Sequence, residues 1–165
     1  MKLRFFTAVQ SDARELAALH TAANEDLTKR FGQGLWSSAA TEKGVLLAVR
    51  RSRVIIARKG TRIVGTLNLQ TKKPWAIDVS YFTPVEKALY LTGMAVLPAM
   101  QKRGVGRALL EEAAKISRAW PADAIRLDAW DADAGAGPFY AKCGFRELAH
   151  TAYKGNPHIY FELVL

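Results

Sequence analysis

Short segments rich in apolar and β-branched residues recur along the chain, and they predict β-strands. The predicted strands are residues 3–9, 53–58, 62–70, 88–96, 124–130, 145–153 and 158–165. Lys59-Gly60-Thr61 lies between the second and third strands and predicts a hairpin. Lys154-Gly155-Asn156-Pro157 predicts a turn between the last two.

Other segments have apolar residues at helical spacing. Asp12 and Glu15 resemble a capping box at the start of one helix. The residues that follow at helical spacing are Leu16, Leu19, His20, Ala23 and Leu27. A strong amphipathic helix is predicted over residues 104–120 and ends at Pro121. A second short helix with loops is predicted around residues 31–47, and another short helix over 134–142. The order β, α, α, β, β, β, α, β, α, β, β predicts an α/β fold with a mixed sheet.

Composition is typical of one globular domain covering residues 1–165. No apolar run reaches the ~18 residues of a membrane span, and the N-terminal residues lack the apolar region of a signal peptide. The single cysteine, Cys143, excludes an internal disulfide and suits a reducing cytoplasm. We therefore expect a soluble, cytoplasmic, single-domain protein.

The formal net charge is +9, from 24 Lys and Arg against 15 Asp and Glu. This excess favours anionic partners such as nucleotides, coenzyme A, nucleic acid or an acidic surface. Basic side chains that only keep the surface soluble would give the same balance. Charge alone does not choose between these explanations.

Glycines at the junction of strand 88–96 with the following helix are the most informative feature. Gln101-Lys102-Arg103-Gly104-Val105-Gly106 runs into the helix start, where backbone N–H groups lack partners and the helix dipole is positive. Such a site holds phosphate, and Lys102, Arg103 and Arg107 add positive charge. Glycines that merely shape a tight turn are the structural alternative. The spacing matches neither a Walker loop nor a dinucleotide-binding fingerprint.

Gln101, Gly104 and Gly106 resemble the signature of the GNAT superfamily of N-acetyltransferases. A second motif follows in the order typical of that family, Phe139-Tyr140-Ala141-Lys142-Cys143-Gly144-Phe145. The predicted order of elements across nearly the whole chain is also similar to the family's. The resemblance implies a mixed, mostly antiparallel central sheet that splays between its fourth and fifth strands, with helices on both faces.

The resemblance also implies where acetyl-coenzyme A, the co-substrate, binds. Backbone groups of Met94 and Val96 would pair with the pantetheine amides, and an N–H near these residues would hold the thioester oxygen. The amides of residues 103–107 would hold the pyrophosphate. The implied cofactor-binding residues are Met94, Ala95, Val96, Gln101, Lys102, Arg103, Gly104, Val105, Gly106 and Arg107.

Tyr140 is the general acid that the resemblance implies, protonating the coenzyme A thiolate as it leaves. Packing on the cofactor is the alternative role for this ring. Asp133 stands where family members often have an asparagine that contacts coenzyme A, and an aspartate cannot donate the same hydrogen bond. Capping of the short helix is the interpretation we favour for Asp133. Tyr90 stands where some members have a glutamate base, so the general base is not identified.

The acceptor side of the site is less specified. The aromatic-rich connection over residues 71–86 is predicted to form part of the acceptor wall. Candidate pocket residues are Trp36, Trp75, Tyr81 and Phe82, and candidate bases are Glu25, Asp26 and Asp78. The three histidines lack metal-ligand spacing, so no metal is expected. We interpret Cys143 as a packing residue.

The resemblance implies an enzyme that acetylates a primary amine of a small molecule, a peptide or a protein by direct attack on the thioester. Acetylation of aminoacyl-tRNA is an alternative that the net charge permits. It is disfavoured because coenzyme A itself explains a basic surface. A non-catalytic acyl-coenzyme A-binding module is a further alternative, against which Tyr140 argues. A homodimer is compatible with the sequence, and no membrane partner is expected.

Overall fold

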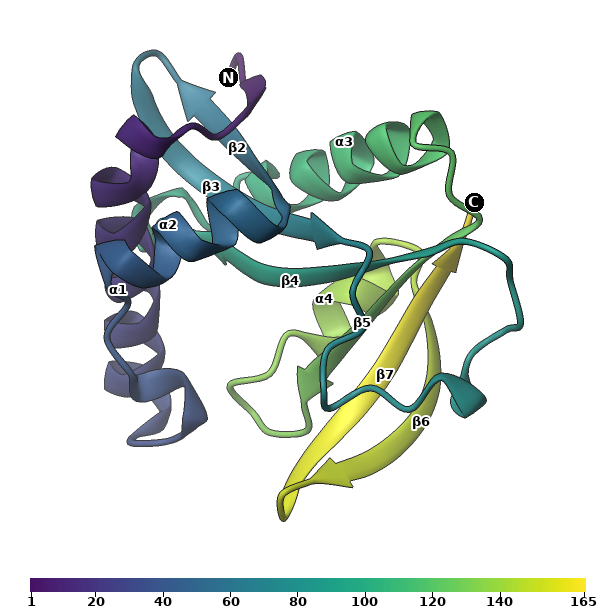
Figure 1. Ribbon diagram of the computed structural model, residues 1–165. Helices are drawn as coiled ribbons and strands as arrows, with labels where there is room; N and C mark the ends of the chain where they lie inside the picture. Colours follow the sequence, from purple (N-terminus) through teal and green to yellow (C-terminus); the bar gives the residue numbers. More distant parts are fainter. The chain divides into compact units, whose positions relative to one another are not determined.

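The computed structural model describes residues 1–165 and contains a seven-stranded sheet with the strand order β1-β2-β3-β4-β5-β7-β6 (Figure 1). The strands are β1 (Arg4–Thr7), β2 (Arg53–Lys59), β3 (Arg62–Gln70), β4 (Ala88–Val96), β5 (Ala124–Trp130), β6 (Arg146–Tyr153) and β7 (Asn156–Val164). The helices are α1 (Ala13–Phe31), α2 (Glu42–Arg51), α3 (Val105–Ala119) and α4 (Gly137–Lys142). The predicted α/β class and the predicted order of elements are confirmed.

The sheet is mixed, as predicted. The pairs β1–β2, β2–β3, β5–β7 and β6–β7 are antiparallel. β4 and β5 are parallel, with Ala88–Tyr90 opposite Ala124–Arg126. This short register at the start of both strands is what a sheet splayed between its fourth and fifth strands requires.

The chain divides into two compact units, which we describe separately. The first comprises residues 1–69 and 92–113, and the second comprises residues 70–91 and 114–165. β4 and α3 therefore contribute residues to both. That the whole chain acts as one domain remains a prediction.

In the first unit, α1 and α2 lie side by side (Figure 1). The buried face of α1 comprises Ala13, Leu16, Ala17, Leu19 and Ala23, which follows the predicted helical spacing. α1 extends to Phe31 and α2 begins at Glu42, so the range 31–47, predicted to hold a second short helix with loops, contains the connection between the helices and the first half of α2. Thr41 explains the start at Glu42, because its side chain accepts a hydrogen bond from the Gly44 N–H and caps α2.

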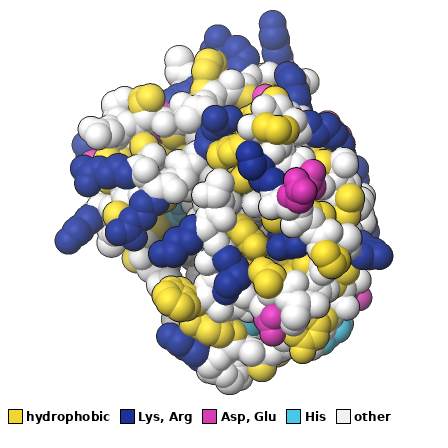
Figure 2. Space-filling view, turned by 45° about the vertical axis from the view of Figure 1, so that its right-hand side comes forward, with side chains coloured by type: hydrophobic (Ala, Val, Ile, Leu, Met, Phe, Trp, Pro, Cys, Tyr) yellow, Lys and Arg dark blue, Asp and Glu magenta, His cyan; other side chains and the backbone are white.

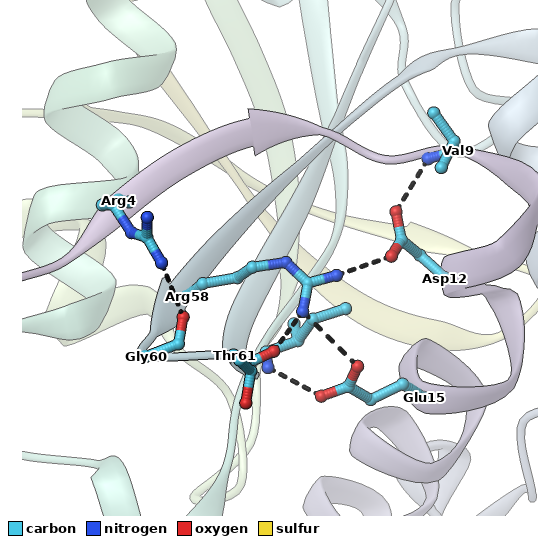
Figure 3. A network of polar contacts seen from close by, with 8 residues as sticks. Arg4, Val9, Asp12, Glu15, Arg58, Gly60 and Thr61 are labelled. Carbon is cyan, nitrogen blue, oxygen red and sulfur yellow. Dashed lines mark hydrogen bonds and ion pairs between the residues drawn. The ribbon is translucent and has the colours of Figure 1, made fainter.

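The predicted capping box at the start of α1 is wrong, because both carboxylates bind elsewhere in the first unit (Figure 3). Asp12 Oδ2 accepts the Val9 N–H at 2.9 Å, and Asp12 Oδ1 lies 2.6 Å from Arg58 Nη2. Glu15 Oε1 accepts the Ile63 N–H at 2.7 Å. These groups tie the start of α1 to the β2–β3 hairpin instead of capping the helix.

In the second unit, β6 and β7 form a long hairpin (Figure 1), and β7 pairs with β5 along its length. The connection before β4 packs on this part of the sheet through Ile77 and Phe82, which form a buried cluster with Tyr90 and Tyr160. The aromatic residues of this connection that were predicted to line the acceptor pocket therefore differ in exposure. Phe82 is buried, whereas Trp75 is 81% exposed.

Candidate functional site

The junction of β4 with α3 is an exposed turn with two residues in the left-handed region. Lys102 has φ 58° and Gly104 has φ 83°. The Gly104 carbonyl accepts the Ala108 N–H at 3.0 Å, so Gly104 directly precedes the first helical turn. A Cβ at Gly104 would meet no atom within 4 Å. The space above this backbone is therefore open, and glycine is required there for its positive φ rather than by crowding.

The first turn of α3 comprises Val105, Gly106 and Arg107. The N–H groups of a first turn have no partner inside their helix and lie at its positive end. The Val105 side chain is 1% exposed and anchors the turn in the core. Lys102, Arg103 and Arg107 are exposed beside it. The arrangement is suited to an anion such as a phosphate.

Gly65 on β3 lies directly against the first turns of α3, and sequence reasoning missed this packing role. A Cβ at Gly65 would lie 2.8 Å from Leu109 Cδ1 and 2.9 Å from Val105 Cγ1. Only glycine therefore allows α3 to pack this closely on β3. A glycine inside a predicted strand is itself a signal of close approach, and it could have identified Gly65.

The second half of β4 carries the residues predicted to contact pantetheine. Met94, Ala95 and Val96 are half-buried, and the Val96 carbonyl accepts the Gln101 side-chain amide at 3.3 Å. Gln101 thus braces the loop to the end of the strand. All the predicted cofactor-binding residues lie in the first unit, on β4, the loop and the start of α3.

Tyr140, the predicted acid, lies on α4 in the second unit and is 7% exposed. The rings of Phe139, Phe145 and Phe161 surround it, with centroids 5.5, 5.7 and 6.0 Å away. Burial raises the pKa of the Tyr140 hydroxyl, and the negative charge of Asp128 raises it further. The hydroxyl therefore stays protonated at neutral pH and can donate a hydrogen bond.

Asp128 on β5 also contacts a histidine that the sequence did not single out. Asp128 Oδ2 lies 2.7 Å from His158 Nδ1 on β7, and His158 is 8% exposed. The two residues are 30 positions apart. Only the pairing of β5 with β7 brings them together, so no local signal in the sequence could have found the pair.

The structure also shows the surroundings of Asp133, Tyr90 and Asp78, which the sequence analysis had considered for other roles. Asp133 is exposed and does not cap α4, whose N-cap is Ala136, so that interpretation is corrected. The Tyr90 hydroxyl accepts a hydrogen bond from Arg126 at 3.2 Å. Asp78 accepts hydrogen bonds from the side chain and backbone of Ser80, which lower its pKa and weaken it as a base.

The other acceptor-side candidates are at the surface or partly covered. Asp26 forms an ion pair with Arg30 at 2.8 Å, and Glu25 is exposed. Tyr81 is 51% exposed and Trp36 is half-buried. No group of three or more His, Cys, Asp or Glu residues is arranged to hold a metal ion. None of the helices has both the length and the apolar character needed to cross a membrane.

The chain was compared with known protein families, and the match includes both the glycine loop at residues 101–106 and the motif at residues 139–145. A profile of the acetyltransferase (GNAT) family matches residues 16–145. No curated protein sequence matches the chain.

Solved structures with the same fold are numerous but distant in sequence. PaiA N-acetyltransferase from Thermoplasma acidophilum, solved with coenzyme A, is 14% identical with a TM-score of 0.75, over 97% of this chain and 98% of that one. YncA, a putative acetyltransferase from Salmonella typhimurium solved with acetyl-coenzyme A, is 14% identical with a TM-score of 0.72, over 99% and 94%. An acetyltransferase from Thermus thermophilus is 18% identical with a TM-score of 0.71, over 100% and 98%.

Proposed function

Because the chain belongs to the acetyltransferase (GNAT) family, we propose that it transfers the acetyl group of acetyl-coenzyme A to a primary amine. The amine attacks the thioester directly, and no acetyl group is passed to the protein. PaiA and YncA, which share the fold, were solved with coenzyme A and acetyl-coenzyme A. That choice of ligand supports acetyl-coenzyme A as the donor here.

The observation that carries the proposal is the open backbone at the start of α3. Gly104 has a positive φ and free space above it, and the first-turn N–H groups of Val105, Gly106 and Arg107 follow it. A pyrophosphate would accept these N–H groups and gain from the helix dipole. Exposed Lys102 and Arg103 would add charge attraction.

The remaining steps are assigned to β4 and α4. Backbone groups of Met94 and Val96 would bind the pantetheine amides, and an N–H near Ala95 would stabilise the negative charge that forms on the thioester oxygen. Tyr140 would donate its proton to sulfur as the carbon–sulfur bond breaks. Its raised pKa keeps the hydroxyl protonated throughout the neutral range, so it can hydrogen-bond to the sulfur as negative charge builds there.

Substitution of Gly106 by valine tests the binding assignment. A β-branched side chain in the first turn would cover the N–H groups, so we expect the Kd for acetyl-coenzyme A to rise at least about tenfold, roughly 1.4 kcal/mol. Calorimetry measures this, with Gly44→Val in the first turn of α2 as the matched control. A folded Gly106→Val protein with wild-type affinity would contradict the assignment.

A further inference from the structure

Gly93 interrupts the regular geometry of β4 in the half of the strand that carries the proposed donor site. Its φ of 58° lies in the left-handed region, and a glycine with this conformation in a strand is typical of a β-bulge. Gly93 is exposed, whereas Leu89, Tyr90 and Leu91 earlier in the strand are buried. The backbone of β4 is therefore accessible at Gly93, which belongs to the first unit.

The side-chain amide of Asn68 on β3 lies against this glycine, in the same unit. A Cβ at Gly93 would be 2.7 Å from Asn68 Nδ2, 3.2 Å from its Cγ and 3.6 Å from its Oδ1. β3 and β4 are neighbours in the sheet, and the Leu97 N–H donates to the Val64 carbonyl at 3.0 Å. Because Gly93 has no side chain, the whole amide group of Asn68 fits over β4 at this point.

Asn68 differs from the other polar residue on its face of β3. Side chains alternate along a strand, so Thr66 and Asn68 share the face opposite Gly65, the residue on which α3 packs. Thr66 is fully buried and donates to the Ile55 carbonyl at 2.8 Å. Asn68 is half-buried, and its amide makes no hydrogen bond within the chain. Its two N–H donors and its carbonyl oxygen are all left for a ligand.

The proposed path of the donor leads to the Asn68 amide. The pyrophosphate would lie at residues 103–107, beyond the end of β4, and the pantetheine amides would pair first with Val96 and then with Met94. The thioester follows the pantetheine amides, so it would come next along the strand, beside Gly93. Successive strand residues are only about 3.3 Å apart, so a side chain that covers Gly93 is within reach of this group.

We propose that Asn68 Nδ2 donates a hydrogen bond to the thioester oxygen of acetyl-coenzyme A and stabilises the negative charge that develops on it during attack. The inference rests on the proposed function and adds a side-chain donor to the backbone N–H assigned to the same oxygen.

The role of Asn68 in this step is electrostatic. As the amine nitrogen forms the C–N bond, the π electrons of the thioester carbonyl move onto oxygen, and they return when the C–S bond breaks and its electron pair stays on sulfur. Asn68 gains and loses no proton. Its hydrogen bond is stronger to the charged oxygen than to the neutral carbonyl, so it should raise kcat more than it raises affinity for the donor.

The kinetic test compares the wild type with Asn68→Leu and Asn68→Asp. Leucine keeps the branched outline of asparagine without a donor, and aspartate places an acceptor where the donor was. The substrates are acetyl-coenzyme A and a panel of an alkylamine, an arylethylamine, an aminosugar and a peptide with a free α-amino group. We expect kcat with the best amine to fall by about 10²–10³ in both variants, with the Kd for acetyl-coenzyme A and the KM for the amine nearly unchanged.

Gln70→Leu is the matched control. Gln70 lies two residues further along β3 on the same face, but its amide is occupied by the Lys72 carbonyl, which accepts its N–H at 2.8 Å. This variant also loses a side-chain amide from β3 and should keep the wild-type kcat.

Infrared spectroscopy of bound acetyl-coenzyme A, labelled with ¹³C at the carbonyl carbon, tests the hydrogen bond without any amine. A donor to the oxygen weakens the C=O bond, so the stretching frequency should be lower in the wild type and in Gln70→Leu than in Asn68→Leu. The measurement needs only a bound donor, and it separates a hydrogen bond to the thioester from a general loss of activity.

Two results would overturn the inference and leave the proposed function standing. One is an Asn68→Leu protein with wild-type kcat and the wild-type carbonyl frequency. The other is a raised KM for the amine with unchanged kcat, which would assign Asn68 to the acceptor instead. A wild-type protein that does not bind acetyl-coenzyme A would overturn both the inference and the proposed function. A wild type that lowers the carbonyl frequency through Asn68 but acetylates no amine of the panel would contradict the proposed function alone.

Discussion

At the scale of single residues, the environment of Tyr140 determines its chemistry. A phenol among three aromatic rings loses solvation when it ionises, and the Asp128 charge adds to that cost. Both effects raise its pKa, so the hydroxyl remains a proton donor throughout the neutral range. Ionisation of Tyr140 should therefore not limit activity below about pH 10, the ordinary pKa of tyrosine.

Tyr140→Phe should lower kcat by about 10²–10⁴, because it removes the proton donor and keeps the ring packing. The Kd for acetyl-coenzyme A should change little. Steady-state kinetics with the best amine and calorimetry measure the two quantities, and Tyr153→Phe on β6 is the control. A near-normal kcat would remove Tyr140 from the mechanism without affecting the binding assignment.

At the scale of elements, the connection between β3 and β4 is held to the sheet by a buried carboxylate. Glu162 on β7 is 1% exposed and accepts the Thr83 N–H at 3.1 Å and Arg146 Nη2 at 2.8 Å, as well as the Thr83 hydroxyl. Arg126 donates to the Thr83 carbonyl at 2.8 Å. Burial alone would raise the Glu162 pKa, but the hydrogen bonds from Thr83 and Arg146 outweigh it and lower the pKa.

Glu162→Gln should lower the free energy of unfolding by about 2 kcal/mol at pH 7, because the new amide NH2 would face donors. The depressed pKa means that the wild-type advantage is complete above pH 4.5, the ordinary value, and is lost as pH falls through the folded-state value. Urea unfolding at pH 7 and at pH 3 measures this. Glu111→Gln, on the exposed face of α3, is the control. If Glu162→Gln lowered the free energy of unfolding equally at both pH values, the conclusion that Glu162 is ionised in the folded protein would be contradicted.

At the scale of the whole molecule, the main property is the net charge of +9. Lys and Arg side chains predominate on the face in Figure 2, with few acidic groups among them. Coenzyme A carries three phosphate groups, so a basic surface favours its approach. Attraction between exposed charges is screened by salt, with a Debye length of about 10 Å at 0.1 M.

Raising the ionic strength from 0.05 to 0.5 M should therefore raise the Kd for acetyl-coenzyme A by about an order of magnitude. Pantetheine, which lacks the phosphates, should bind with little dependence on salt. Calorimetry over a salt series compares the two ligands. If both ligands showed the same flat dependence, the basic side chains would have no part in binding the donor.

Much of the fold could be predicted from the sequence, and the sequence also named the candidate site residues. β3, β4 and β5 have the predicted bounds, and α3 begins one residue after the prediction. These elements depend on side-chain periodicity and on glycine and proline, which act within a few residues. The second helix was predicted only within the broad range 31–47, because a single N-cap residue such as Thr41 is a weaker sequence signal than a long apolar stripe.

Gln101, Gly104, Gly106 and Tyr140 could be named as candidates from the sequence, because glycines at a helix start and a helix-borne phenol are local motifs; their roles remain predictions. Pairing between distant strands decided the rest. It brings His158 to Asp128 over 30 residues and Glu162 to Thr83 over 79 residues. It also diverts Glu15 from capping α1 to the backbone of β3, 48 residues away. A sequence pattern shows which face of a strand a side chain takes, but only the register between strands determines which group it meets there.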